Sequence, residues 1–314
     1  MSALFDVILP VFLVVGFGYV VCWRQMLSEV AVDGIMRFAQ NFAVPVLLFQ
    51  AIAKLDLGAN FDPFLLLAFY IGAFLSFATG LSAAYYWLKR PIEDSIAIGF
   101  VCLFSNSLLL GIPITERAYG PEALLGNFTI ISIHSPLLYT FGITAMEFAR
   151  AHGKNLSIGR VALRALSGVL HTPLVIGILC GLVMNLLTQA GLVMPEGFWG
   201  AVKMLASAAL PSALFALGGV LYRYRPEGEM RAIAICCAAS LLLHPGVTYL
   251  MGKLFGLGVA EMRSAVVTAS MAPGVNAYLF ASLYGVAKRV AASAVLVATA
   301  LSILTIWFWL SVLP

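Results

Sequence analysis

Two short stretches of the sequence place polar and helix-breaking residues inside long apolar segments. Residues 105–113 are SNSLLLGIP, and residues 270–276 are SMAPGVN. Proline lacks the N–H that a helix needs and disfavours helical geometry in the residue before it, so each stretch predicts an interrupted helix. The new helix ends leave backbone N–H and C=O groups without helical partners, and helix N-termini favour an anion such as a carboxylate.

The candidate binding residues in these stretches are hydroxyl, amide, glycine and proline residues. They are Ser105, Asn106, Ser107, Gly111, Pro113, Pro273, Gly274 and Asn276. The two amides can both donate and accept hydrogen bonds, and the glycines let a ligand approach the backbone. Asn41, four residues before Pro45, is a further candidate; it either faces the same cavity or bonds a neighbouring helix.

Two histidines lie within apolar segments. His134, in the sequence ISIHSP at 131–136, is a candidate for binding a proton, because histidine titrates near neutral pH. The alternative is a neutral histidine bonded to a backbone carbonyl that the neighbouring Pro136 leaves free. The same two interpretations apply to His244, which precedes Pro245.

The sequence lacks the residue patterns that several kinds of chemistry require. The sequence contains no phosphate-binding glycine loop, no HExxH zinc motif and no GxSxG motif, and neither polar stretch contains Asp or Glu. The five cysteines have no metal-ligand spacing and are expected to be free packing residues. We therefore expect no catalytic residue, no bound metal and no cofactor.

The composition indicates an integral membrane protein. Of the 314 residues, 62% are hydrophobic and only 10% are charged, whereas soluble domains are about one quarter charged. The net charge of +4 is attributed to membrane topology and not to a nucleic-acid partner. Ten apolar spans are expected at 4–22, 34–53, 63–88, 95–119, 122–148, 168–187, 199–222, 230–251, 261–285 and 287–312.

The ten expected spans divide into two groups of five. The boundaries are 1–149 for the first repeat, 150–167 for a basic linker, and 168–314 for the second repeat. Similar residues recur at offsets of 163 to 166, including Pro45 with Pro211 and Ser105 with Ser270. An odd number of spans per half makes the second half insert upside down, so an inverted repeat is expected.

Charge predicts the orientation of the spans. The odd-numbered loops with their flanking helix ends hold 13 of the 18 Lys and Arg residues. The positive-inside rule then places the linker 150–167 in the cytoplasm and both termini in the periplasm of a cell inner membrane.

Four motifs together resemble the auxin efflux carrier family, whose bacterial members include malonate and malate carriers. They are PVFLVVGFGY at 10–19, NFAVPVLLF at 41–49, Asn106 with Gly111-Ile112-Pro113, and APGVN at 272–276. The resemblance implies two inverted five-helix repeats whose fourth and ninth helices are broken and cross. It also implies a scaffold group of spans one, two, six and seven beside a transport group, with Asn106, Pro113 and Pro273 at the crossing.

The resulting expectation is a secondary transporter of a small organic anion, with a dicarboxylate such as malonate or malate as the first candidate. Binding is expected at the crossing helices, with alternating access across the lipid bilayer. The alternatives are an organic-anion channel and a membrane-embedded enzyme or sensor. A proton is a candidate coupling ion, and a homodimer is a candidate assembly.

Overall fold

The computed structural model describes residues 3–54, 63–150 and 172–314. Every regular element in these residues is a helix, and the sole extended pairing is an isolated bridge between Ser105 and Pro273. The expected all-helical architecture is confirmed. Most of the expected linker 150–167 and the start of the sixth span lie outside the described residues.

Seven helical segments of the described chain are long and apolar enough to cross a membrane. They are Phe5–Trp23, Glu29–Ala53, Pro63–Trp87, Leu124–Arg150, Glu196–Arg223, Met230–Phe255 and Lys288–Val312. Pro173–Gln189 is a shorter apolar helix. The two remaining expected spans, 95–119 and 261–285, each contain an interruption. The count of ten spans therefore stays a prediction.

The chain forms two compact units, and each draws on both halves of the sequence. Unit 1 consists of Met1–Pro10, Asp62–Ala165 and Tyr224–Pro314, and unit 2 of Val11–Phe61 and Leu166–Arg223. Unit 2 holds nearly all of expected spans one, two, six and seven, which the family resemblance assigns to one group. This division differs from the expected repeats 1–149 and 168–314, which it does not test.

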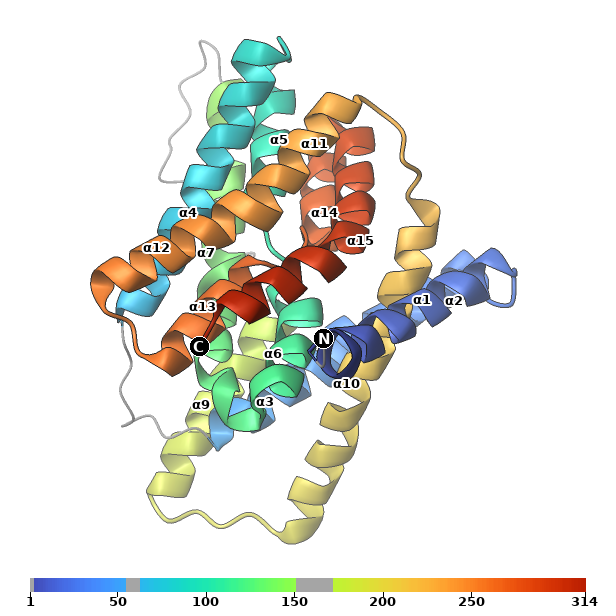
Figure 1. Ribbon diagram of the computed structural model, residues 1–314. Coiled ribbons are helices and arrows are strands. Elements are labelled where there is room, and N and C mark those ends of the chain that lie inside the picture. Colours follow the sequence, from blue (N-terminus) through green and yellow to red (C-terminus); the bar gives the residue numbers. More distant parts are fainter. Residues whose placement is uncertain (1–2, 55–62, 151–171) are drawn as a thin grey trace. The chain divides into compact units, whose positions relative to one another are not determined.

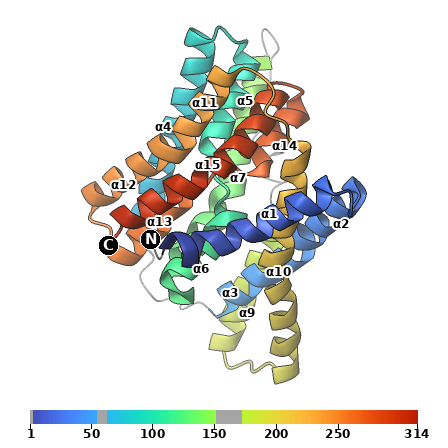
Figure 2. The same cartoon turned by 45° about the vertical axis from the view of Figure 1, so that its right-hand side comes forward.

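The described residues of unit 2 form five α-helices and a π-helical turn. They are α1 (Leu9–Trp23, from Val11 on), α2 (Glu29–Phe38), η2 (Ala39–Ala43), α3 (Val44–Ala53), α9 (Pro173–Gln189) and α10 (Glu196–Arg223). Figures 1 and 2 show α3 beside both α9 and α10.

Glycines allow two close helix contacts in unit 2. A Cβ on Gly18 of α1 would overlap the backbone carbonyl of Phe215 on α10. A Cβ on Gly181 of α9 would lie 2.8 Å from the backbone oxygen of Phe49 on α3, and one on Gly177 would lie 2.5 Å from that of Pro45. Gly177 and Gly181 form a GxxxG pattern, a sequence feature that is common where membrane helices pack closely.

Unit 1 contains the other helices. The α-helices are α4 (Pro63–Ser82), α5 (Ile92–Leu103), α6 (Ile112–Tyr119), α7 (Leu124–Arg150), α11 (Met230–Ala238), α12 (His244–Phe255), α13 (Val259–Ala269), α14 (Val275–Tyr284) and α15 (Lys288–Val312). The short elements are η1 (Ala3–Ile8), η3 (Ala83–Trp87), η4 (Ser107–Gly111), η5 (Pro121–Ala123) and η6 (Ala239–Leu243). In both cartoon views α4 runs beside α5 and α12 (Figures 1 and 2).

Pro113 does not break its helix, contrary to the expectation from sequence. The π-helical turn η4 runs directly into α6, and Pro113 occupies the first turn of α6. The interruption lies further back, at residues 104–106. Pro45 and Pro245 also follow π-helical turns, η2 and η6. A wider turn has a different hydrogen-bond pattern from an α-helix, which allows the missing proline N–H to be accommodated without ending the helix.

Candidate functional site

The two interrupted segments of unit 1 pair with each other through their backbones. The N–H of Asn106 donates to the carbonyl of Ala272 over 2.8 Å, and the N–H of Gly274 donates to the carbonyl of Phe104 over 2.9 Å. These bonds satisfy groups that the helix ends leave without partners, because apolar surroundings make an unpaired backbone group costly. Two stretches that are distant in sequence thus lie side by side.

The first interruption supplies its own cap. Asn106 has non-helical dihedrals (φ −77°, ψ 59°), and its Oδ1 accepts a hydrogen bond from the N–H of Leu109 over 3.3 Å. This is an N-cap, in which a side-chain oxygen takes one of the free N–H groups at a helix start. Asn106 is 7% exposed, so its side chain is largely enclosed.

The second interruption has no such cap. Gly274 is the N-cap residue of α14, and no side-chain cap is present there in the described part of the protein. Asn276, the second residue of α14, is partly exposed, and its side-chain amide makes no hydrogen bond within the described part of the chain. Its backbone carbonyl accepts from the hydroxyl of Tyr139 over 3.2 Å. The start of α14 therefore combines free backbone donors with a free amide.

His134 lies against the first interruption. Its Nε2 is 3.5 Å from the Oγ of Ser107, which is 2.9 Å from the Oγ of Ser105. The imidazole is 3% exposed and packs edge-on against Phe104 and Phe69, with ring centroids 4.8 and 5.6 Å away. The ring thus contacts a hydroxyl pair at the break. Among the described residues it makes no hydrogen bond to the carbonyl that Pro136 leaves free, which was the alternative expected from sequence. Its Nδ1 has no hydrogen-bond partner in the described residues.

Asn127 connects the two interrupted segments and was not identified from sequence. Its Nδ2 donates to the hydroxyl of Thr115 on α6 over 3.0 Å and to that of Thr268 on α13 over 2.8 Å. All three side chains are fully buried, and Oδ1 of Asn127 has no partner in the described chain. We call these three residues the amide clasp. It joins the helix after the first interruption to the helix before the second.

The two glycines at the interruptions are not required by close packing. A Cβ on Gly111 would lie 3.7 Å from Met271 Cγ, and one on Gly274 would lie 3.6 Å from Asn106 Cα. These are ordinary contact distances. The expected role of Gly111 and Gly274 in admitting a ligand stays a prediction.

Two other polar residues were singled out from sequence, His244 and Asn41. His244 is buried in α12, with its ring 4.9 Å from that of Phe69, and neither of its nitrogens has a hydrogen-bond partner among the described residues. Asn41 is an exposed residue of η2 in unit 2. Its expected place at the same cavity therefore stays a prediction.

The paired interruptions carry no formal charge. Residues 104–107 and 270–276 contain no acidic or basic side chain, and the described residues contain no cluster of His, Cys, Asp and Glu that could hold a metal ion. The polar character comes from hydroxyls, amides and helix-end N–H groups. Such a set can bind an anion through hydrogen bonds without a buried cation.

A largely apolar helical chain with two mutually paired helix breaks defines a multi-pass membrane protein. The family model for "Membrane transport protein" matches residues 3–310, and the chain belongs to this family, the auxin efflux carriers. A protein named "Putative malonate transporter" from Rhizobium meliloti is 25% identical over 98% of this chain and 94% of its own length. An "Uncharacterized transporter" from Methanothermobacter thermautotrophicus is 25% identical over 85% of this chain and 87% of its own.

A plant protein matches part of the chain. The "Probable auxin efflux carrier component 3b" of Oryza sativa is 29% identical over 154 residues, which are 46% of this chain and 25% of the rice protein. With the family established, the protein is a membrane transporter and not an enzyme.

Proposed function

We propose that the protein is a secondary carrier of a small organic anion, with dicarboxylates of the malonate and malate type as the first candidates. The observation that carries this proposal is the start of α14, where uncapped N–H groups and the free amide of Asn276 lie beside the paired interruption. An anion is the ligand that a helix N-terminus favours. The name of the Rhizobium meliloti relative supports the choice of malonate.

In this proposal the substrate carboxylate accepts hydrogen bonds from α14 and Asn276. Ser105, Ser107 and the backbone near Pro273 complete the site, while Asn106 holds the start of η4 and α6. Access alternates as the group that carries the interruptions moves against the scaffold group. Ten spans in two inverted repeats would provide the required symmetry.

The close contacts in unit 2 support the inverted repeat. Gly18 and Gly181 are 163 residues apart, and their respective partners Phe215 and Phe49 are 166 residues apart. A first-half helix thus packs on a second-half helix twice, through equivalent residues. Equivalent contacts at one sequence offset are expected when two repeats are related by symmetry.

A proton is the coupling ion to test first, and His134 is its candidate carrier. The imidazole lies against Ser107 at the first interruption, close enough for its protonation to alter the hydroxyl pair. Histidine can exchange a proton near neutral pH. Without coupling, the anion would follow its gradient and the membrane potential, which is worth about 2.3 kcal/mol per charge per 100 mV.

The orientation is proposed from the distribution of basic residues. The linker 150–167 faces the cytoplasm, and both termini face the periplasm. Cysteine labelling from each side, at the chain ends and within the linker, tests this orientation; labelling of the termini from the cytoplasmic side alone would contradict it. Light scattering of the purified protein tests the expected homodimer.

The substrate proposal is tested by uptake into proteoliposomes that contain the purified protein. Labelled malonate, malate, succinate, acetate and a neutral sugar are compared at equal concentration, with protein-free liposomes as the control. We expect saturable uptake of at least one dicarboxylate and none of the sugar. Uptake of cations or neutral solutes alone would refute the anion site, and single-channel currents far above carrier turnover would identify a channel.

A further inference from the structure

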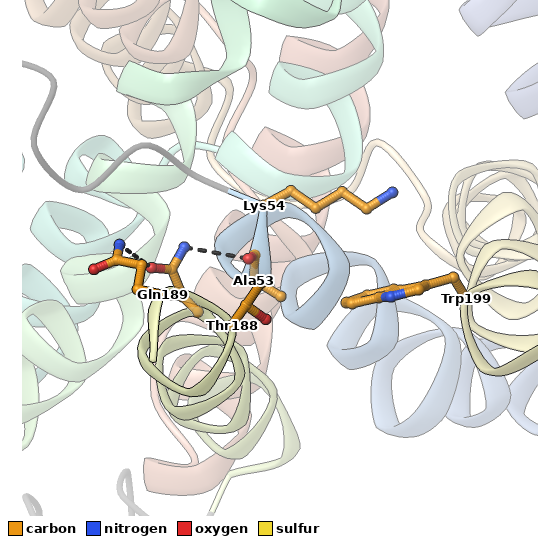
Figure 3. Close-up of a pocket in the computed structure, with 6 residues that line it drawn as sticks. Ala53, Lys54, Thr188, Gln189 and Trp199 are labelled. Carbon is orange, nitrogen blue, oxygen red and sulfur yellow. Dashed lines mark hydrogen bonds between the residues drawn. The ribbon is translucent and has the colours of Figure 1, made fainter. Parts of the chain in front are cut away.

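Unit 2 contains a pocket that is not part of the paired interruptions. Its volume is about 510 Å³, and it lies where α3 and α9 end and α10 begins (Figure 3). The described lining residues are Ala53, Lys54, Asn185, Thr188, Gln189 and Trp199. A volume of this size falls in the range of small-molecule sites. Among the described lining residues, one is a cation and none is a carboxylate.

The negative end of α3 is compensated inside this pocket. Asn185 donates from Nδ2 to the carbonyl oxygens of Ile52 and Ala53, over 3.0 and 3.2 Å. Gln189 donates from Nε2 to Oδ1 of Asn185 over 2.9 Å (Figure 3). The last carbonyls of a helix carry partial negative charge and disfavour an anion nearby. The amide of Asn185 occupies these carbonyls, and Gln189 in turn holds Asn185, which removes that obstacle.

Lys54 provides a positive charge in this pocket. Figure 3 shows its side chain extending from the end of α3 toward Trp199, and its Nζ lies 5.3 Å from the indole centroid. Trp199 is in turn stacked on Phe49, at 6.1 Å and 22°. Among the described residues, no carboxylate forms an ion pair with Lys54. The indole contact helps to position the ammonium, while its N–H donors remain available.

The residues around the pocket are typical of a membrane surface. Trp and Lys are the side chains that gather where hydrocarbon meets the polar headgroups. On α9, the apolar side chains of Val183, Leu186 and Leu187 are 55%, 54% and 44% exposed just before the pocket. A lipid whose headgroup enters the pocket would have apolar side chains nearby for its acyl chains.

We propose that this pocket binds the phosphate of an anionic phospholipid headgroup. Lys54 supplies the charge for the phosphate, as lysine does in many phosphate sites. Thr188, whose hydroxyl donates to the carbonyl of Met184, and the amide of Gln189 line the pocket from α9, and Trp199 covers the glycerol part. The proposal concerns unit 2 alone and holds whether or not the carrier function proposed above is correct.

The test compares three ligands that separate a lipid from a free anion. Thermal unfolding of the purified full-length protein in a neutral detergent is followed with short-chain phosphatidylglycerol, short-chain phosphatidylcholine or glycerol 3-phosphate. We expect saturable stabilisation by phosphatidylglycerol, and little by the other two. Equal stabilisation by phosphatidylcholine, whose phosphate is offset by the choline cation, would refute the proposed preference for an anionic headgroup. Stabilisation by glycerol 3-phosphate as strong as that by the lipid would refute the lipid assignment.

Matched variants locate the binding. Lys54→Gln is expected to raise the half-saturating concentration of phosphatidylglycerol about tenfold, the usual effect of losing one charged contact. Lys203→Gln removes an equal charge from an exposed residue of α10 outside the lining and is expected to behave like the wild type. Thr188→Asp adds a negative charge while Lys54 is retained, and should weaken binding as well. Equal affinities in Lys54→Gln, Thr188→Asp and the control would refute the proposal.

Discussion

The interruptions at 104–106 and at 270–274 contain similar residues but have different local structures. Asn106 caps the helix that it begins, whereas Asn276 lies in the first turn of a helix that no side chain caps. The first interruption also contacts His134 through Ser107, whereas the residue that contacts Asn276 is Tyr139, whose hydroxyl donates to the Asn276 backbone carbonyl. Similar residues in the two interrupted stretches therefore have different surroundings.

The difference suggests a division of roles between the two breaks. A side-chain oxygen that already accepts from its own helix has less capacity left for a ligand. A free amide beside free backbone donors keeps that capacity. The first interruption is suited to holding the pair of breaks in place, and the second is suited to contacting the substrate.

The largest expected effect is on substrate affinity in Asn276→Ala. Loss of a hydrogen bond to a charged group costs about 1.5–3 kcal/mol, or about ten- to a hundredfold in affinity. The melting temperature should not change, because the amide has no partner in the described protein. Substrate binding and uptake kinetics of the purified variant measure both effects. If the variant binds substrate like the wild type, Asn276 is not part of the site, and the proposed division of roles between the two breaks is wrong.

A second variant checks whether the loss in Asn276→Ala is electrostatic. Asn276→Asp preserves size but places a negative charge near the expected carboxylate. We expect it to bind an anion more weakly than the alanine variant does. An aspartate variant that binds better than the alanine variant would indicate that Asn276 donates no hydrogen bond to an anion.

The amide clasp connects the two interruptions, and its loss should lower stability by about 2 kcal/mol. Asn127→Leu removes two buried hydrogen bonds and leaves two threonine hydroxyls without their donor. Replacing the whole clasp, with Asn127→Leu, Thr115→Val and Thr268→Val together, should recover most of the loss, because no polar group is then stranded. Thermal unfolding measures both variants. A triple variant that is the least stable would show that the polar groups themselves are required.

The cap at the first interruption should contribute a smaller amount. Asn106→Ala removes the acceptor for the N–H of Leu109 and should cost about 1 kcal/mol, whereas Asn106→Ser retains a capping oxygen and should cost less. The melting temperatures of Asn106→Ala and Asn276→Ala are compared to test whether only the first break depends on an asparagine cap. Equal destabilisation by the two alanine variants would mean that both asparagines act as caps.

The smallest effect is expected for His134→Gln, which should flatten the pH profile of uptake while transport persists. Glutamine can still bond Ser107 but cannot bind a proton near neutral pH. The matched control is His244→Gln, because His244 is equally buried in unit 1 but has no recorded contact with the serines. Uptake is measured against pH, with and without an imposed potential. An unchanged profile in His134→Gln would make His134 a packing residue.

Local patterns in the sequence were sufficient for several features. Apolar segments and scarce charge predict membrane helices, and clustered Ser, Asn, Gly and Pro predict where two of them are interrupted. The GxxxG pattern predicts a close helix contact. These inferences succeed because each depends on residues within a few turns of one another.

The exact place of the first break was not predictable in this way. Proline removes one hydrogen bond, but a π-helical turn before Pro113 absorbs the change, and the chain leaves the helix at 104–106. At that point the carbonyl of Phe104 accepts from the N–H of Gly274, and the N–H of Asn106 donates to the carbonyl of Ala272. The helix ends where another segment can replace its backbone bonds.

Residue types and their order were enough to indicate a helical membrane protein with two interrupted helices and an uncharged, hydrogen-bonding centre. Folding in three dimensions assigned the different environments of Asn106 and Asn276 and formed the amide clasp. The partners of Asn127 are 12 and 141 residues away, and the bond between Gly274 and Phe104 joins residues from opposite halves of the chain. Contacts at such separations arise from the packing of whole helices, because buried polar groups take whichever partners that packing brings within reach.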